Sequence, residues 1–369
     1  MKLRIRTSFL AFVHLVFLYA CVETYDVDFQ MNADLVTVDG FMTDQGGDVI
    51  TLSISHNKGD DSYSIPLTGC KAEIIPGTGG VIPLTEVSEG NYSPPANFRG
   101  KVGETYQLRF TTSAGKTYKS SAEKLNDVPE ITKVYEAFNK KGLTDKTGTR
   151  VLGSAVDIYL DFEDPASSRN YYLWRWKLFE QQYICITCNG GRLNGLTCIQ
   201  DRSPTPSTYD YPCRSACWEI FYNDNVNIVA DDFFNGKAVV GRLIAQIPFY
   251  SQTGSLLEIE QVSLSKEAYD YYKLLRDQTQ TTGTLTDTPP APIIGNIQNI
   301  DDPKEKVIGY FGTAGSRRIR YWVDRTVYKE ADLTPILGRQ MLLEPTSPSP
   351  TYPCFQSRTR TPIRPAEWR

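Results

Sequence analysis

Apolar and polar residues alternate over short stretches in the first third of the chain. The alternation is clearest at three places, residues 50–55, 70–74 and 106–111. A period of two residues predicts β-strands that bury one face. The segments 77–80 and 113–116 contain glycine and are typical of turns, because glycine adopts positive φ without steric cost. Short strands in succession predict an immunoglobulin-like β-sandwich over residues 33–122.

The alternation resumes after a polar segment that ends in Val128 and Pro129. Further strands are predicted at residues 156–162, 171–179, 238–248, 256–264, 307–311 and 319–323. One helix is predicted to begin after Ser265, a natural N-cap, with Ala268 and Tyr272 on its apolar face. The predicted fold class is therefore mainly β: an N-terminal immunoglobulin-like β-sandwich followed by a second, larger antiparallel β domain, residues 130–369, with one clear helix.

The N-terminus has the features of an export signal. Lys2, Arg4 and Arg6 precede an apolar run over residues 9–20. As a helix this run is roughly 18 Å long, too short for a bilayer core of about 30 Å, so residues 1–20 are predicted to be a signal peptide. The run ends in Leu18-Tyr19-Ala20-Cys21, which resembles a bacterial lipobox.

In a lipobox protein the cysteine is lipidated and becomes the first residue after cleavage. Acyl chains such as palmitate on Cys21 are predicted to anchor the protein to a membrane, with residues 21–32 as a short acidic tether. An ordinary secretory signal with a chance cysteine is the alternative.

Composition and charge exclude several classes of protein. Hydrophobic residues make up 40% of the chain and charged residues 22%, which is typical of a folded globular protein and not of a disordered one. The formal net charge is −4, and removal of the basic signal makes it more negative. Since no basic cluster stands out, nucleic acid is not an expected partner.

Most of the cysteines gather in residues 185–217, which we predict to be a cysteine-rich excursion from the second domain. The candidates for disulfide bonds are Cys185, Cys188, Cys198, Cys213, Cys217 and the distant Cys354. Export favours three disulfides, in one of fifteen possible connectivities. Four thiolates at Cys-x-x-Cys and Cys-x-x-x-Cys spacing are also compatible with a tetrahedral zinc ion. Cys70 is expected to be a buried free thiol.

Candidates for catalysis are few. His56 is the only histidine beyond the signal, and no Gly-x-Ser-x-Gly motif is present. Neighbouring carboxylates, which a glycosidase or a calcium site requires, occur at Asp161 with Glu163 and Asp164, at Asp231-Asp232 and at Asp301-Asp302. Such pairs are common at turns, so we expect no catalytic residue, no metal and no cofactor.

An aromatic strand is the best candidate for ligand binding. Tyr172, Trp174 and Trp176 fall on one face of the predicted strand at 171–179. Exposed aromatic side chains bind sugars and peptides, and protein interfaces are enriched in them. The alternative is that this face belongs to the core.

Several segments resemble an uncharacterised Bacteroidetes family catalogued as domain of unknown function 4249. They are residues 21–26, 35–41, Asp161-Phe-Glu-Asp-Pro165 with Asn170-Tyr-Tyr172, Asp231-Asp-Phe-Phe-Asn-Gly236, and residues 264–272, 295–297 and 307–311. The resemblance implies an outer-membrane lipoprotein, often encoded beside TonB-dependent receptors, with no assigned activity or catalytic residues.

These observations favour a non-enzymatic lipoprotein on the periplasmic or cell-surface face of the outer membrane. We expect it to capture a ligand or to serve as an accessory partner of a TonB-dependent transporter, with residues 185–217 and 283–303 as contact regions. A carbohydrate-active enzyme with paired carboxylates and a purely structural envelope lipoprotein are the alternatives.

Overall fold

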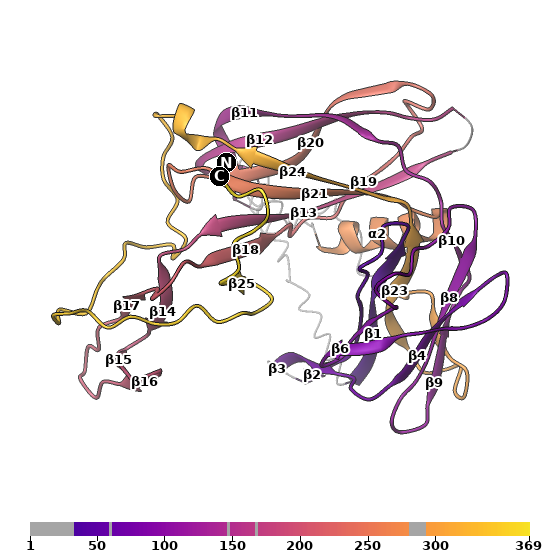
Figure 1. The fold of residues 1–369 in the computed structure, drawn as a ribbon, viewed down its shortest axis with the longest axis horizontal. Helices are drawn as coiled ribbons and strands as arrows, with labels where there is room; N and C mark the ends of the chain where they lie inside the picture. Colours follow the sequence, from indigo (N-terminus) through magenta and orange to yellow (C-terminus); the bar gives the residue numbers. More distant parts are fainter. Residues whose placement is uncertain (1–32, 59–60, 146–147, 167–168, 280–292) are drawn as a thin grey trace, which may run out of the picture.

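The structure is a computed structural model that describes residues 33–58, 61–145, 148–166, 169–279 and 293–369. The predicted signal peptide, the lipidation site Cys21 and the tether lie outside the described residues, as do residues 283–292 of one expected contact region. The described chain forms two β-sandwiches, a helix between them, and an arm that projects from the second sandwich (Figure 1).

The first sandwich consists of two mainly antiparallel sheets that pack around one core. One sheet contains β1 (Ala33–Thr43), β2 (Ile50–Lys58), β3 (Asp61–Pro66), β6 (Thr85–Ser88), β7 (Asn91–Ser93) and β23 (Val307–Ala314). The other contains β4 (Lys71–Pro76), β5 (Ile82–Pro83), β8 (Thr105–Thr111), β9 (Thr117–Ser120), β10 (Glu123–Lys124) and β22 (Ile297–Asn299). The alternating apolar positions of the sequence point inward, with Leu52, Ile74 and Leu108 fully buried.

Two strands of the first sandwich come from the last quarter of the chain, which the sequence prediction had assigned to the second domain. β23 runs parallel to β1 from Val36 opposite Val307 to Thr43 opposite Ala314, and β22 pairs with β9. At Gly309 (φ 94°) a Cβ atom would lie 1.8 Å from the carbonyl oxygen of Val38, so this close approach requires glycine. The period-two pattern located β23 correctly but carries no information about its partner.

The second sandwich packs a three-stranded sheet on a six-stranded one. The smaller sheet contains β11 (Ile131–Thr144), β12 (Val151–Glu163) and β20 (Ala238–Pro248), with β20 at an edge. The larger contains β13 (Tyr171–Gln181), β18 (Trp218–Tyr222), β19 (Asn227–Ala230), β21 (Ser255–Ser263), β24 (Ser316–Val323) and β25 (Arg360–Thr361). A 3-10 turn, η1 (Arg325–Val327), follows β24. The mainly β fold is therefore confirmed.

The helix α2 (Lys266–Thr279) packs between the two sandwiches. Ser265 caps it, because its hydroxyl accepts a hydrogen bond of 3.0 Å from the backbone N–H of Ala268, as the sequence predicted. Apolar residues from α2, from β13 and from β1 and β23 share one cluster here. Within the described residues, no helix is both long and apolar enough to cross a membrane.

The arm consists of β14 (Ile184–Cys188), β15 (Gly191–Asn194), β16 (Thr197–Gln200) and β17 (Tyr209–Pro212), and we use this name for residues 184–217. Figure 1 shows it extending away from the end of β13 and β18, with the C-terminal part of the chain running beside it. We call residues 339–354 the tail. Bridges join Asp210 to Leu343 and Cys213 to Tyr352, so the tail adds to the arm along much of its length.

Candidate functional site

Three disulfides hold the arm and the tail. Cys185 is bonded to Cys213, Cys188 to Cys198, and Cys217 to Cys354 across 137 residues of sequence. This arrangement agrees with the disulfide prediction, and it leaves no thiolate in the arm for zinc. The sulfurs of Cys185, Cys217 and Cys354 lie within 4.8 Å of one another, but each belongs to a disulfide. Among the cysteines that the structure describes, only the half-buried Cys70 is free.

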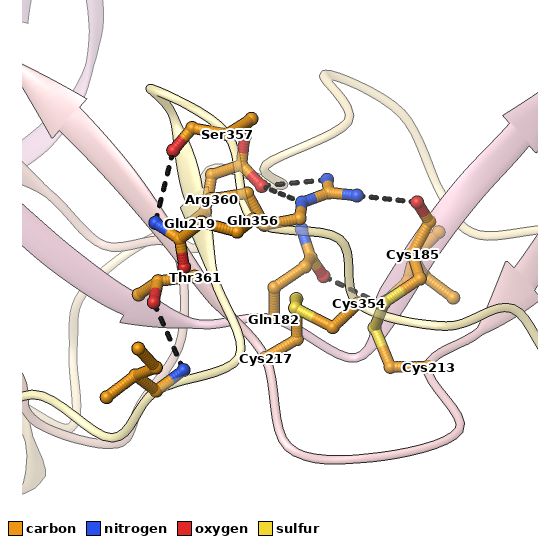
Figure 2. The surroundings of a disulfide bond; sticks show 12 residues. Gln182, Cys185, Cys213, Cys217, Glu219, Cys354, Gln356, Ser357, Arg360 and Thr361 are labelled. Atoms are coloured by element: carbon orange, nitrogen blue, oxygen red, sulfur yellow. Dashed lines mark hydrogen bonds and ion pairs between the residues drawn. A yellow bond between two sulfur atoms is a disulfide. The ribbon is translucent and has the colours of Figure 1, made fainter. Parts of the chain in front are cut away.

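Polar contacts add to the disulfides. The buried carboxylate of Asp210 accepts two hydrogen bonds of 2.8 Å from the Arg339 guanidinium and one of 2.8 Å from the backbone N–H of Leu342. Burial alone raises the pKa of Asp210, but these bonds outweigh it and hold the pKa below its ordinary value. At the base of the arm, Figure 2 shows Arg360 between the carboxylate of Glu219 and the backbone carbonyl of Cys185. The arm and the tail therefore form one rigid unit.

This unit presents apolar side chains to solvent. Four of them are about half exposed: Leu196, Ile199, Met341 and Leu342. Single exposed apolar residues are ordinary, but several on one rigid projection are typical of a surface that contacts another molecule.

The structure corrects the expectation that the aromatic face of β13 binds a ligand. Tyr172 and Trp174 are fully buried in the second core, so they present no surface to a sugar or a peptide. The reason is the second sheet, since Phe162 of β12 packs against both rings. Trp176 is only half-buried and lines two cavities described below.

The sequence segments around 161–172 and 231–236 meet at one end of the second sandwich. The buried carboxylate of Asp164 accepts hydrogen bonds from the Tyr172 hydroxyl at 2.5 Å and from the backbone N–H of Gly236 at 2.9 Å. Asp231 accepts one of 2.8 Å from the backbone N–H of Asn170. These carboxylates fix turns at the ends of β12, β13 and β19, which is a structural role.

The other predicted carboxylates also bind their own chain. Asp161 accepts a hydrogen bond of 2.8 Å from the N–H of Gly241, and Asp301 one of 2.8 Å from the N–H of Thr117. Neither of them lines one of the two cavities, and the same holds for Glu163 and His56. The fold thus places Asp301 and His56 in the first sandwich and Asp161 and Glu163 in the second, instead of bringing all four groups to one site.

Two cavities lie on either side of the loop 223–226. This loop joins β18 to β19, which pair with different halves of one side of β13 and leave the middle of that side without a strand partner, while β21 pairs along the other side. Asn223 fills the gap: its backbone N–H donates to the carbonyl of Trp176 at 3.2 Å, and its side-chain oxygen accepts from the N–H of Trp176 at 3.0 Å. Trp176 and the loop therefore form a wall that both cavities share.

The first cavity, of about 570 Å³, lies where β1 of the first sandwich faces the outer side of β13. Its two glutamates are paired with cations: Glu260 lies 2.7 Å from Arg175, and Glu258 lies 2.7 Å from Lys177. Burial raises the pKa of both glutamates, but the neighbouring cations outweigh it and leave both pKa values lowered. Both are ionised at neutral pH, so neither supplies the protonated carboxyl that a glycosidase needs.

The second cavity, of about 750 Å³, opens along the edge strand β20 and reaches the end of α2 at Thr279. Its lining includes Arg242 of β20, which the sequence analysis did not single out. The available signal was an arginine among the apolar residues of the strand predicted at 238–248, and its meaning depends on the edge position of that strand and on the groups that face it across the sandwich.

The fold and these features define the class of protein: two β-sandwiches, the first completed by strands from the last quarter of the chain, with a disulfide-clamped arm on the second. The model of the family described as Domain of unknown function (DUF4249) matches residues 22–320, and the chain belongs to this family. No curated protein matches the chain.

Proposed function

We propose that this protein is a non-enzymatic lipoprotein of the outer membrane that docks, through its arm, on a TonB-dependent transporter and serves as its accessory or ligand-capturing partner. The observation that carries the proposal is the arm itself, a rigid projection with exposed apolar side chains. The lipobox-like sequence at Cys21 and the family resemblance support the location and the partner.

Rigidity favours docking. Two disulfides lie within the arm and a third joins the arm to the tail. Because these bonds already restrict the conformations of the arm, docking costs less conformational entropy and the affinity is higher. Disulfides also form in exported compartments and not in the cytosol, which agrees with an envelope protein.

The apolar side chains supply the contact energy. Full burial of one such side chain stabilises a complex by about 1.5–3 kcal/mol, so covering a half-exposed one contributes about 1 kcal/mol. Loss of Leu196, Ile199 and Met341 together is expected to weaken docking by about 3 kcal/mol, or about 100-fold.

The test is affinity purification of the tagged protein from detergent-solubilised outer membrane, followed by mass spectrometry. The unsubstituted protein is expected to recover a large β-barrel transporter in stoichiometric amount. The triple variant with Leu196→Ser, Ile199→Ser and Met341→Ser is expected to lose it. Val87→Ser is the matched control, because Val87 is an exposed apolar residue of the first sandwich, far from the arm in sequence.

Recovery of the lipoprotein without any transporter contradicts the proposal. Equal recovery by the triple variant and by the control retains the partner but removes the arm as the docking surface.

A further inference from the structure

Arg242 points into the second sandwich from its edge. It lies opposite Leu160 in the register of β20 and β12, and residues opposite each other in a sheet project to the same face. Leu160 is fully buried in the core, so Arg242 projects toward the interior. Its guanidinium lies 4.8 Å above the ring of Trp174 and lines the 750 Å³ cavity.

The charge of Arg242 has no carboxylate partner among the described residues. Its Nη2 donates to the side-chain oxygen of Asn227, while its buried Nε has no partner and its Nη1 makes no hydrogen bond with any described residue. Burial lowers the pKa of Arg242, and no neighbouring anion opposes this.

Other arginines of this sandwich are neutralised. The fully buried Arg325 makes two hydrogen bonds to Glu180, and Arg175 makes two to Glu260. A half-buried guanidinium that faces a cavity with donors unused is therefore an exception in this fold. Guanidinium groups bind carboxylates through two parallel hydrogen bonds. We therefore expect the ligand of Arg242 to be an anion.

The rest of the cavity narrows the class of ligand. Its volume lies within the range of about 300–1,000 Å³ that is usual for small-molecule sites. The indole of Trp176 offers an apolar surface, and the exposed carboxylate of Asp224 accepts hydrogen bonds but repels a second anion. A ligand that satisfies all three groups has a carboxylate for Arg242, hydroxyl groups for Asp224 and an apolar ring face for Trp176.

We propose that this cavity binds an acidic saccharide, a sugar chain that contains uronic acid, with its carboxylate on the guanidinium of Arg242. This inference rests on the cavity and not on the arm, so its test is independent of the test of the proposed transporter contact.

A competing explanation is structural. Inward-pointing charged residues on edge strands prevent unwanted pairing with other chains, and β20 is an edge strand with irregular register. Under that explanation Arg242 has no ligand, and the experiment distinguishes the two.

The experiment is calorimetric titration of the full mature protein with trisaccharides of glucuronic or galacturonic acid. Neutral trisaccharides of glucose and galactose and a tripeptide with a free C-terminal carboxylate are titrated in parallel. We expect one acidic trisaccharide to bind at least tenfold more tightly than its neutral counterpart, with an affinity that falls as salt is added.

Two variants and a control locate the site. Arg242→Gln is expected to lower the affinity at least tenfold, and Arg242→Lys to retain part of it, because lysine keeps the charge but not the bidentate geometry. Arg358→Gln is the matched control: Arg358 lines the first cavity, lies over the ring of Tyr222 and has no ion-pair partner among the described residues. The Arg358→Gln variant is expected to bind the acidic trisaccharide with the affinity of the unsubstituted protein.

Equal binding of acidic and neutral sugars overturns the proposal, as does failure of both acidic trisaccharides to bind. Binding of the tripeptide alone overturns the saccharide assignment. If Arg242→Gln does not fold, the comparison of sugars on the unsubstituted protein and the Arg242→Lys variant still decide the question.

Discussion

The buried ion pair between Arg325 and Glu180 provides the most direct test of the second sandwich. The guanidinium donates hydrogen bonds of 2.9 and 2.5 Å to the carboxylate and one of 2.7 Å to the carbonyl of Pro248. The two side chains are 0% and 1% exposed. Burial raises the pKa of Glu180 even beside Arg325, so removal of Arg325 leaves a carboxyl in the interior without its counter-ion.

The expected magnitude follows from this burial. Breaking a buried pair by removing one partner destabilises a protein by about 3–5 kcal/mol, whereas an exposed pair contributes about 0–1 kcal/mol. We therefore expect Arg325→Met to lower the free energy of unfolding of the second sandwich by about 3–5 kcal/mol. The double variant Glu180→Leu with Arg325→Met is expected to recover most of this loss, since apolar side chains of similar volume carry no buried charge.

Tryptophan fluorescence during urea unfolding measures the effect selectively. All five tryptophans lie outside the first sandwich, at Trp174, Trp176, Trp218, Trp322 and Trp368. At a slope of about 2 kcal/mol per M urea, the midpoint of Arg325→Met is expected to fall by about 1.5–2.5 M. Arg320→Met, which removes a partly exposed partner of Glu258, is the control and is expected to cost less than about 1 kcal/mol.

A loss below about 1 kcal/mol for Arg325→Met would refute the reasoning, because it would mean that solvation or protonation of the remaining Glu180 carboxyl costs little. A double variant that is no more stable than Arg325→Met alone would refute the claim that burial of charge is the cause.

Three further predictions concern the arm and the membrane anchor. Replacing both Cys217 and Cys354 by serine is expected to destabilise the protein by about 2–5 kcal/mol in urea unfolding, because their disulfide closes a long loop; an unchanged midpoint would contradict this. The pKa of Asp210 is lowered in the folded state, so its stabilising contribution is present above its ordinary value of 3.8 and is lost as pH falls through the folded pKa. The difference in thermal midpoint between the unsubstituted protein and Asp210→Asn is therefore expected to shrink below pH 3.8, and a difference that is independent of pH would argue against the contact with Arg339. Cys21→Ser is expected to abolish incorporation of radiolabelled palmitate and to move the protein from the membrane fraction to the soluble one; retention in the membrane would rule out lipidation as the anchor.

Local sequence patterns predicted the secondary structure well. The strand expected at 238–248 coincides with β20, and the helix begins directly after Ser265 as expected. Both successes have the same cause: the alternation of side chains along a strand and the capping of a helix depend on residues that are close in sequence.

The aromatic strand shows where this information ends. Alternation placed Tyr172, Trp174 and Trp176 on one face, but it could not tell a face covered by a second sheet from one open to solvent. Burial depends on β12, which supplies Phe162 from a separate part of the chain.

The sequence predicted only part of the candidate sites, because local patterns do not show which residues meet in the fold. Cysteine content and the predicted export signal indicated disulfides, whereas their pairing required the arm and the tail to come together. For the cavity at Arg242 the sequence offered only an arginine among the apolar residues of a predicted strand, because an arginine acquires a special role only when the fold leaves it half-buried without a carboxylate.

The sequence by itself determined the positions of most strands, the start of the helix and the identity of the bonded cysteines. Only the tertiary structure decided that β23 completes the first sandwich, which cysteines pair, and which polar groups are neutralised. The physical reason is that backbone conformation and burial pattern are set by near neighbours, whereas strand partners, disulfides and buried charges join residues that are far apart in the chain.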